Sequence, residues 1–227
     1  MYLDNRIQQK YTALLIAIML AAGIIVYSNS FHAEMVFDDH SFIMDDPAVH
    51  LTALSWDGIK KAALEGSPPH RYLPNISWAL NYYFGQLNPF GYHVVNLVIH
   101  LLTGMFLFSL IKNMLRVYPG QSRDIHPDII AFFAALIWMV QPVGTQSVTY
   151  ICQRMASMVA LFYILSLLLY VQARMAMRQH PEHRLIPGLY FTGCLLAGVC
   201  AMATKENAGT LPLVILLYEW FFFQNLR

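Results

Sequence analysis

Long apolar runs alternate with polar connections along this sequence. The runs reach about 20 residues, the length of helix that crosses a hydrocarbon core about 30 Å thick. Taken in order they predict six membrane crossings, at residues 11–31, 92–115, 128–140, 148–171, 188–204 and 210–223. The third run is short because Gln141-Pro142 interrupts it at membrane depth. Irregular backbone at that depth is tolerated only where it is buried in protein or lines a wet cavity.

Two amphipathic stretches lie in the long polar segment of residues 32–91. Residues 56–64 place apolar side chains on one helical face opposite two lysines, with Ser55 as the N-cap and Gly66 as the stop. Residues 75–84 carry a stripe rich in aromatic side chains. Amphipathic aromatic helices beside a bilayer usually lie in its interfacial plane. We therefore expect two surface helices in this segment.

Composition strengthens the membrane interpretation. Hydrophobic residues make up 57% of the 227 positions and charged residues 12%, about half the charged fraction of a soluble domain, and the mean hydropathy is +0.47. The net charge of +1 gives no support for nucleic-acid binding. Cys152, Cys194 and Cys200 lie in or beside apolar runs, which predicts core residues and neither disulfides nor a zinc site.

The lysines and arginines predict an orientation. Cytoplasmic connections carry an excess of these residues close to the helix ends. The richer set contains Arg6, Lys10, Lys112, Arg116, Arg123, Arg174, Arg178, Arg184 and Arg227, and the poorer set contains Lys60, Lys61, Arg71, Arg154 and Lys205. This asymmetry predicts a multi-pass protein with both termini in the cytoplasm and residues 32–91 on the extracytoplasmic face, in a periplasm or lumen.

An acidic motif follows the first run by a few residues. It contains the adjacent pair Asp38-Asp39, and the predicted topology puts Arg154 and Lys205 on the same side of the membrane. One outward cavity with these groups would suit a lipid-phosphate sugar donor, because cations stabilise a leaving phosphate and a carboxylate takes the proton of an acceptor hydroxyl. A single carboxylate is enough for transfer with inversion in one displacement.

Structural alternatives stand beside each of these assignments. Asp38-Asp39 could be a solvated loop or a helix cap, and Arg154 could be an interfacial residue whose charge reaches the bilayer surface. Lys205-Glu206 could neutralise itself at a helix junction, and Arg71 could anchor a surface helix. The histidines of the loop lack tight ligand spacing, so we predict no metal site, with a divalent metal as the less favoured alternative.

Several motifs resemble a known family. In chain order they are His70-Arg71-Tyr72-Leu73, Asn88-Pro89-Phe90-Gly91-Tyr92-His93, Gln141-Pro142-Val143, Tyr150-Ile151, Arg154 and Lys205-Glu206. With this order and spacing the chain resembles the transmembrane-and-tetratricopeptide-repeat O-mannosyltransferases of the GT-C glycosyltransferase superfamily. The resemblance runs from about residue 37 to residue 219.

The resemblance implies a site. An Asp of the first outer loop is expected to activate the acceptor, which corresponds to Asp38 or Asp39, with Asp38 favoured. Arg71, Arg154 and Lys205 are expected to bind the donor phosphate, and Glu206 to position Lys205. No cofactor is required. The expected partners are a polyprenyl-phosphate sugar donor, a protein or glycan acceptor and the lipid bilayer, without nucleic acid.

Departures from the family pattern affect three positions. Tyr72 stands where the family usually has Pro, Gln141 where it has His, and Gln146 where it has an acid. Family members are also longer, so we expect residues 1–227 to be a single membrane domain from the N-terminal part of a longer protein. The predicted function is glycosyl transfer by an all-α, GT-C-like polytopic module. The alternatives are a lipid-linked glycan transporter or flippase, and a non-catalytic membrane assembly partner.

Overall fold

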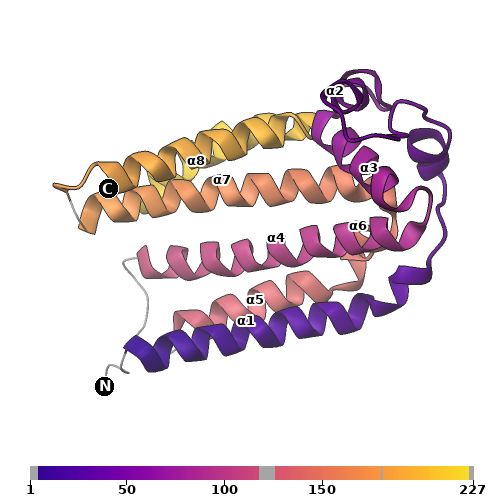
Figure 1. Cartoon of the computed structure of the whole chain (residues 1–227). Coiled ribbons are helices and arrows are strands. Elements are labelled where there is room, and N and C mark those ends of the chain that lie inside the picture. Colours follow the sequence, from indigo (N-terminus) through magenta and orange to yellow (C-terminus); the bar gives the residue numbers. More distant parts are fainter. Residues whose placement is uncertain (1–4, 118–125, 180, 225–227) are drawn as a thin grey trace.

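A computed structural model describes residues 5–117, 126–179 and 181–224 of this chain, with side chains from residue 7 onward. Arg123 and Arg227, and the side chain of Arg6, lie outside the described residues. The described part contains helices and no strand, which confirms the all-α class. Its long helices run side by side as an elongated bundle (Figure 1), and they are α1 (Asn5–Tyr27), α4 (Pro89–Val117), α5 (Pro127–Val140), α7 (Arg154–Gln179), α8 (Leu185–Met202) and α9 (Leu211–Phe222).

The long helices identify an integral membrane protein. Four of them are long and apolar enough to cross a bilayer, and a bent pair makes a fifth span if its two parts are counted together. The sixth predicted crossing corresponds to α9, whose 12 residues rise about 18 Å and fall short of the hydrocarbon thickness. A crossing by α9 stays a prediction.

The fourth predicted run, at residues 148–171, differs from the helix in its place. α7 begins at Arg154 and continues to Gln179, because the preceding residues form a series of short turns. These turns are η3 (Pro142–Gly144), α6 (Gln146–Thr149) and η4 (Ile151–Gln153). The apolar content of the sequence therefore identifies the run but does not predict the residue at which regular helix begins.

The break after α5 occurs where the sequence predicts it. α5 ends at Val140, and the chain bends by 54° before α6. Pro142 lacks a donor N–H and disfavours helix at the residue before it. The freed carbonyl of Met139 accepts hydrogen bonds from His100 Nε2 at 2.8 Å and from the Tyr27 hydroxyl at 3.2 Å. This backbone carbonyl at the break is thus hydrogen-bonded inside the protein.

Two helices form in the long loop, as predicted. α2 (Trp56–Glu65) has Ser55 as its N-cap, whose side chain accepts the Gly58 N–H at 3.1 Å, and its C-cap is Gly66. α3 (Tyr72–Gly85) begins three residues before the predicted stretch. Shorter turns, η1 (Ser28–His32) and the π-helical η2 (His40–Met44), connect α1 with this region.

The bundle has two ends (Figure 1). The terminal end holds the start of α1 and the end of α9, and the loop end holds α2, α3 and α6. The described cations of the richer set lie near the terminal end, and those of the poorer set lie at the loop end. The folded chain therefore separates the two sets of charges as the sequence predicts. Which end faces the cytoplasm stays a prediction.

Candidate functional site

Asp39 is a buried anchor. Its side chain has no exposed surface, and its two carboxylate oxygens accept the backbone N–H of Val36 at 3.0 Å and of Cys152 at 2.8 Å. Hydrogen bonds to a charged acceptor are about twice as strong as neutral ones. Asp39 therefore fixes the acidic segment against η4, and both of its oxygens are already occupied.

Asp38 has the opposite environment. Its side chain is exposed, and its backbone N–H donates to the Tyr150 hydroxyl at 3.2 Å. Burial raises the pKa of Tyr150 to about 12, and a hydrogen bond with the Asp38 carboxylate adds to the rise. Tyr150 is therefore protonated at neutral pH. The residue before the pair, Phe37, has φ of 51°, a left-handed conformation that bulky residues rarely adopt and that is often found at functional sites.

Arg154 lies fully buried at the start of α7. Its Nε donates to Asn96 Oδ1 at 2.7 Å, and its Nη1 donates to Ser77 Oγ at 2.9 Å and to Asn81 Oδ1 at 2.7 Å. Its Nη2 donates to the Tyr92 carbonyl at 2.9 Å. Four of its five N–H donors are thus used by α3 and α4. In this conformation the guanidinium joins three helices, and its contact with a donor phosphate stays a prediction.

Arg71 and Glu206 form an ion pair at the junction of α3 and α8. Arg71 Nη2 lies 2.5 Å from Glu206 Oε2, with 18% of the Arg71 side chain and 71% of the Glu206 side chain exposed. The Leu73 N–H donates to the Ala203 carbonyl at 3.3 Å and so holds the start of α3 against the end of α8. A hydrogen bond from its own backbone and the charge of Arg71 keep the pKa of Glu206 below its usual value.

Lys205 is half-buried beside this ion pair. Glu206 forms its ion pair with Arg71, and the positioning of Lys205 by Glu206 stays a prediction. The charge of Lys205 also lowers the pKa of Glu206, so all three groups interact electrostatically. Two cations and one carboxylate leave a net positive charge at this point of the loop end.

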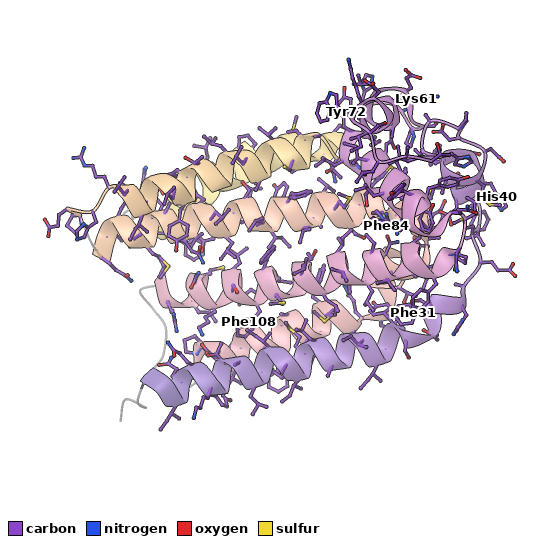
Figure 2. The ribbon with its side chains drawn as sticks, in the orientation of Figure 1. Phe31, His40, Lys61, Tyr72, Phe84 and Phe108 are labelled. Carbon is purple, nitrogen blue, oxygen red and sulfur yellow. The ribbon has the colours of Figure 1, made fainter. Side chains whose placement is uncertain are left out.

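The six predicted site residues all lie at the loop end, as the acidic pair Asp38-Asp39, the cluster of Arg71, Lys205 and Glu206, and the separate Arg154. Figure 2 labels His40 and Tyr72, which neighbour the acidic pair and Arg71, and both lie there. No described hydrogen bond or ion pair joins the acidic pair to the Arg71–Glu206 pair. Arg154 contacts elements of both. Cys152, two residues before it, donates to Asp39, and Arg154 itself donates to Ser77 and Asn81 of α3, the helix that follows Arg71.

A cavity of about 430 Å³ adjoins the Arg154 network. Ser77 and Asn81, two acceptors of Arg154, lie on its wall. The rest of the wall is apolar and comes from α3, α4 and α7, with Leu73, Ile76, Leu80, Phe84, Val95, Met158 and Phe162. A mainly apolar cavity with a few polar groups at one side is typical of a site for an amphiphile.

The sequence predicts no part in the site for Tyr150, Cys152, Asn81 or Asn96, although three of them stand in or near the motifs. Their hydrogen bonds join residues more than fifty positions apart, Tyr150 with Asp38, Cys152 with Asp39, and Asn81 and Asn96 with Arg154, so local patterns carry no signal for them. Within the described ranges, no group of three His, Cys, Asp or Glu side chains could hold a metal ion. The absence of a metal requirement stays a prediction.

Curated proteins of known family match this chain. Protein O-mannosyl-transferase Tmtc3 of Drosophila melanogaster is 28% identical over 225 residues, which cover 91% of this chain and 24% of that protein. Protein O-mannosyl-transferase TMTC2 of Homo sapiens is 28% identical over 218 residues, with coverage of 91% and 24%. TMTC1 of Mus musculus is 28% identical over 217 residues, with coverage of 90% and 22%.

The chain is related to these O-mannosyl-transferases. The resemblance that the motifs indicate is thereby confirmed over nearly the whole chain. The chain spans about a quarter of the length of the curated relatives it matches. No family model matches it, and no solved structure matches it.

Proposed function

We propose that this chain is the membrane module of a glycosyltransferase of the GT-C type. It transfers a sugar from a polyprenyl-phosphate donor to a protein or glycan acceptor on the extracytoplasmic face, with inversion in a single displacement. The relatives named protein O-mannosyl-transferases support mannose as the sugar and a protein as the acceptor. The main observation in its favour is the different environment of the two adjacent acids. The Asp38 carboxylate is exposed, whereas the Asp39 carboxylate is buried and accepts two backbone N–H groups.

Asp38 is the proposed general base. Its exposed carboxylate can reach an acceptor hydroxyl, whereas both oxygens of Asp39 are occupied by backbone donors. As the acceptor oxygen bonds to the anomeric carbon, its proton passes to Asp38 and the bond from that carbon to the phosphate oxygen breaks. Tyr150, protonated at neutral pH, holds the Asp38 segment in place.

Arg71 and Lys205 are the proposed phosphate ligands. Both lie at the loop end and outnumber the single carboxylate of Glu206, so the cluster attracts an anion. Their charges stabilise the departing polyprenyl phosphate as its negative charge develops. The apolar cavity of α3, α4 and α7, about 430 Å³ in volume, is large enough for part of an isoprenoid chain, and Leu73 on its wall follows Arg71 by two residues.

The test compares two carboxylates of the same loop. The full-length gene product is assayed for transfer of labelled mannose from a polyprenyl-phosphate donor to an acceptor polypeptide. Asp38→Asn should lower the rate by about 100-fold or more, the usual contribution of a general base. Asp45→Asn is the matched control, because Asp45 is an exposed acid in the neighbouring turn, and this variant should transfer at the wild-type rate.

Equal transfer by the wild type and by Asp38→Asn would exclude Asp38 as the base. Movement of the labelled lipid across the bilayer without loss of its sugar would instead favour a lipid-linked glycan transporter. The transporter requires the cations and has no need of the exposed carboxylate.

A further inference from the structure

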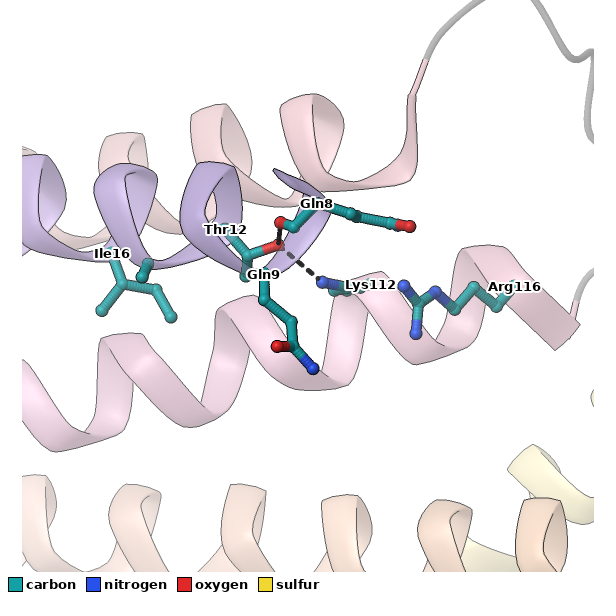
Figure 3. Close-up of a pocket in the computed structure, with 7 residues that line it drawn as sticks. Gln8, Gln9, Thr12, Ile16, Lys112 and Arg116 are labelled. Atoms are coloured by element: carbon teal, nitrogen blue, oxygen red, sulfur yellow. Dashed lines mark hydrogen bonds between the residues drawn. The ribbon is translucent and has the colours of Figure 1, made fainter. Parts of the chain in front are cut away.

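A second cavity lies at the terminal end, far along the bundle from the site above. It is an open cavity of about 440 Å³ between α1 and α4, whose lining residues Figure 3 shows. α4 contributes two cations to its wall, Lys112 and Arg116, and α1 contributes the amide side chains of Gln8 and Gln9. The polar wall therefore contains two positive charges, two amides that can donate hydrogen bonds and the hydroxyl of Thr12.

Two hydrogen bonds hold the Lys112 side chain at the wall of the cavity. Its ammonium group donates to Asp128 Oδ2 at 2.7 Å and to Thr12 Oγ1 at 3.2 Å. Asp128 is fully buried, so its carboxylate faces away from the cavity and fixes Lys112 among α1, α4 and α5. An ammonium group has three N–H donors, and one of them is left for a ligand.

Arg116 carries the charge that Asp128 does not balance. It is exposed one helical turn beyond Lys112 on the same face of α4, and it forms no hydrogen bond or ion pair with another described residue. A guanidinium group matches the geometry of a phosphate and binds it through two parallel hydrogen bonds. Arg116, the remaining Lys112 donor and the two amides together suit a tetrahedral anion.

The cavity becomes apolar toward the middle of the bundle. Ala13 and Ile16 line it on α1, one and two helical turns after Gln9. Figure 3 shows Ile16 on the side away from Arg116. A ligand that fits both parts has an anionic head and an apolar continuation. Basic pockets between membrane helices commonly bind anionic lipid headgroups.

We propose that this cavity binds a phosphate group, and that the headgroup of a membrane phospholipid supplies it. The phosphate lies between Arg116 and Lys112, and an acyl chain follows Ala13 and Ile16. The site is separate from the acidic pair and does not depend on the function proposed above. Free phosphate shares the same chemistry, so the test has an arm for each source.

The experiment measures lipid retention by native mass spectrometry of the purified full chain in detergent. Phosphatidylglycerol is compared with diacylglycerol, which lacks the phosphate, and inorganic phosphate is added in a separate arm. Arg116→Gln should weaken phosphatidylglycerol binding by about fivefold, the effect of one cation at a membrane surface. Ala13→Trp fills the apolar part without changing any charge and should also weaken it. Lys10→Gln is the control, because Lys10 is an exposed cation of α1 outside the cavity wall.

Preferential retention of phosphatidylglycerol over diacylglycerol, weakened in Arg116→Gln and unchanged in Lys10→Gln, supports the phospholipid. Binding of inorganic phosphate with the same dependence on Arg116, but without retained lipid, supports the phosphate site and assigns it to free phosphate. Wild-type binding by both Arg116→Gln and Ala13→Trp overturns the proposal. Equal weakening in Arg116→Gln and Lys10→Gln also overturns it, because that result indicates general surface attraction.

Discussion

Asp38 and Asp39 are adjacent in sequence and differ completely in environment. The left-handed backbone of Phe37 begins a tight turn in which one carboxylate points to solvent and the next points into the protein. The sequence identifies the pair, and the resemblance favours Asp38. The local sequence does not predict which of the two acids is buried, because the Cys152 N–H that donates to Asp39 lies 113 positions further along the chain.

This difference predicts separate effects on stability. Asp39→Asn should lower the free energy of unfolding by about 2 kcal/mol, because the amide NH2 group cannot accept the N–H of Val36 or Cys152 that it would face. Asp38→Asn, on the exposed side chain, should change it by less than about 0.5 kcal/mol. Thermal unfolding of the two purified variants in the same detergent measures the difference. Similar unfolding by both variants would contradict the anchoring role of Asp39.

The Arg71–Glu206 ion pair predicts a dependence on pH. The pKa of Glu206 is lowered in the folded chain, so the carboxylate stabilises the fold above its unfolded pKa, and this contribution disappears as the pH falls through the folded value. Glu206→Gln should therefore lower the unfolding temperature slightly at neutral pH and leave it unchanged in acid. Glu34→Gln, at an exposed glutamate, serves as the control and should have no effect at any pH. A Glu206→Gln effect that persists in acid would argue against the ion pair.

At the scale of elements, local sequence signals predict where helices begin and end better than they predict which helices contact one another. Ser55 caps α2 and Pro142 ends α5, as expected from the immediate sequence. Arg154 shows the limit of such signals. Its neighbours suggest an interfacial or phosphate-binding cation, and its burial follows from acceptors that α3 and α4 bring to it. No local pattern encodes that meeting of three helices.

Arg154→Lys tests whether the guanidinium holds these helices together. A lysine ammonium is a single point of charge and cannot reach acceptors on both α3 and α4, so Ser77, Asn81 or Asn96 would lose its partner. We expect a loss of about 2–3 kcal/mol in the free energy of unfolding. Arg184→Lys, at an exposed arginine near the start of α8, should be neutral. Unfolding of Arg154→Lys at the wild-type temperature would show that the network contributes little.

For the whole molecule, the separation of charges between the two ends was predictable from the sequence. It follows from the order of the apolar runs, because each crossing moves the next connection to the opposite side. The number of crossings was less predictable. Residues 148–171 are apolar throughout much of their length, yet regular helix starts only at Arg154, and α9 is shorter than a full span. The length of an apolar run reports how many consecutive residues are apolar. It does not report where the backbone is helical.

The asymmetry of cations predicts that the loop end faces outward. Two introduced cysteines can test this, Lys61→Cys at the loop end and Arg184→Cys just before α8 at the terminal end, both at exposed positions. Cys200 is replaced by alanine in both, and the buried Cys152 and Cys194 are retained. A membrane-impermeant maleimide applied to intact cells, or to intact right-side-out vesicles, should label Lys61→Cys at once.

Arg184→Cys should be labelled only after the membrane is permeabilised, because the richer set of cations keeps the terminal end in the cytoplasm. The reverse pattern would place Asp38 and Arg71 on the cytoplasmic side, where the proposed extracytoplasmic transfer could not occur. The phospholipid cavity would then lie at the outer leaflet. Its ligand would have to come from the lipids of that leaflet, which in many membranes carry less negative charge than those facing the cytoplasm. Labelling therefore decides the orientation of both proposed sites in one measurement.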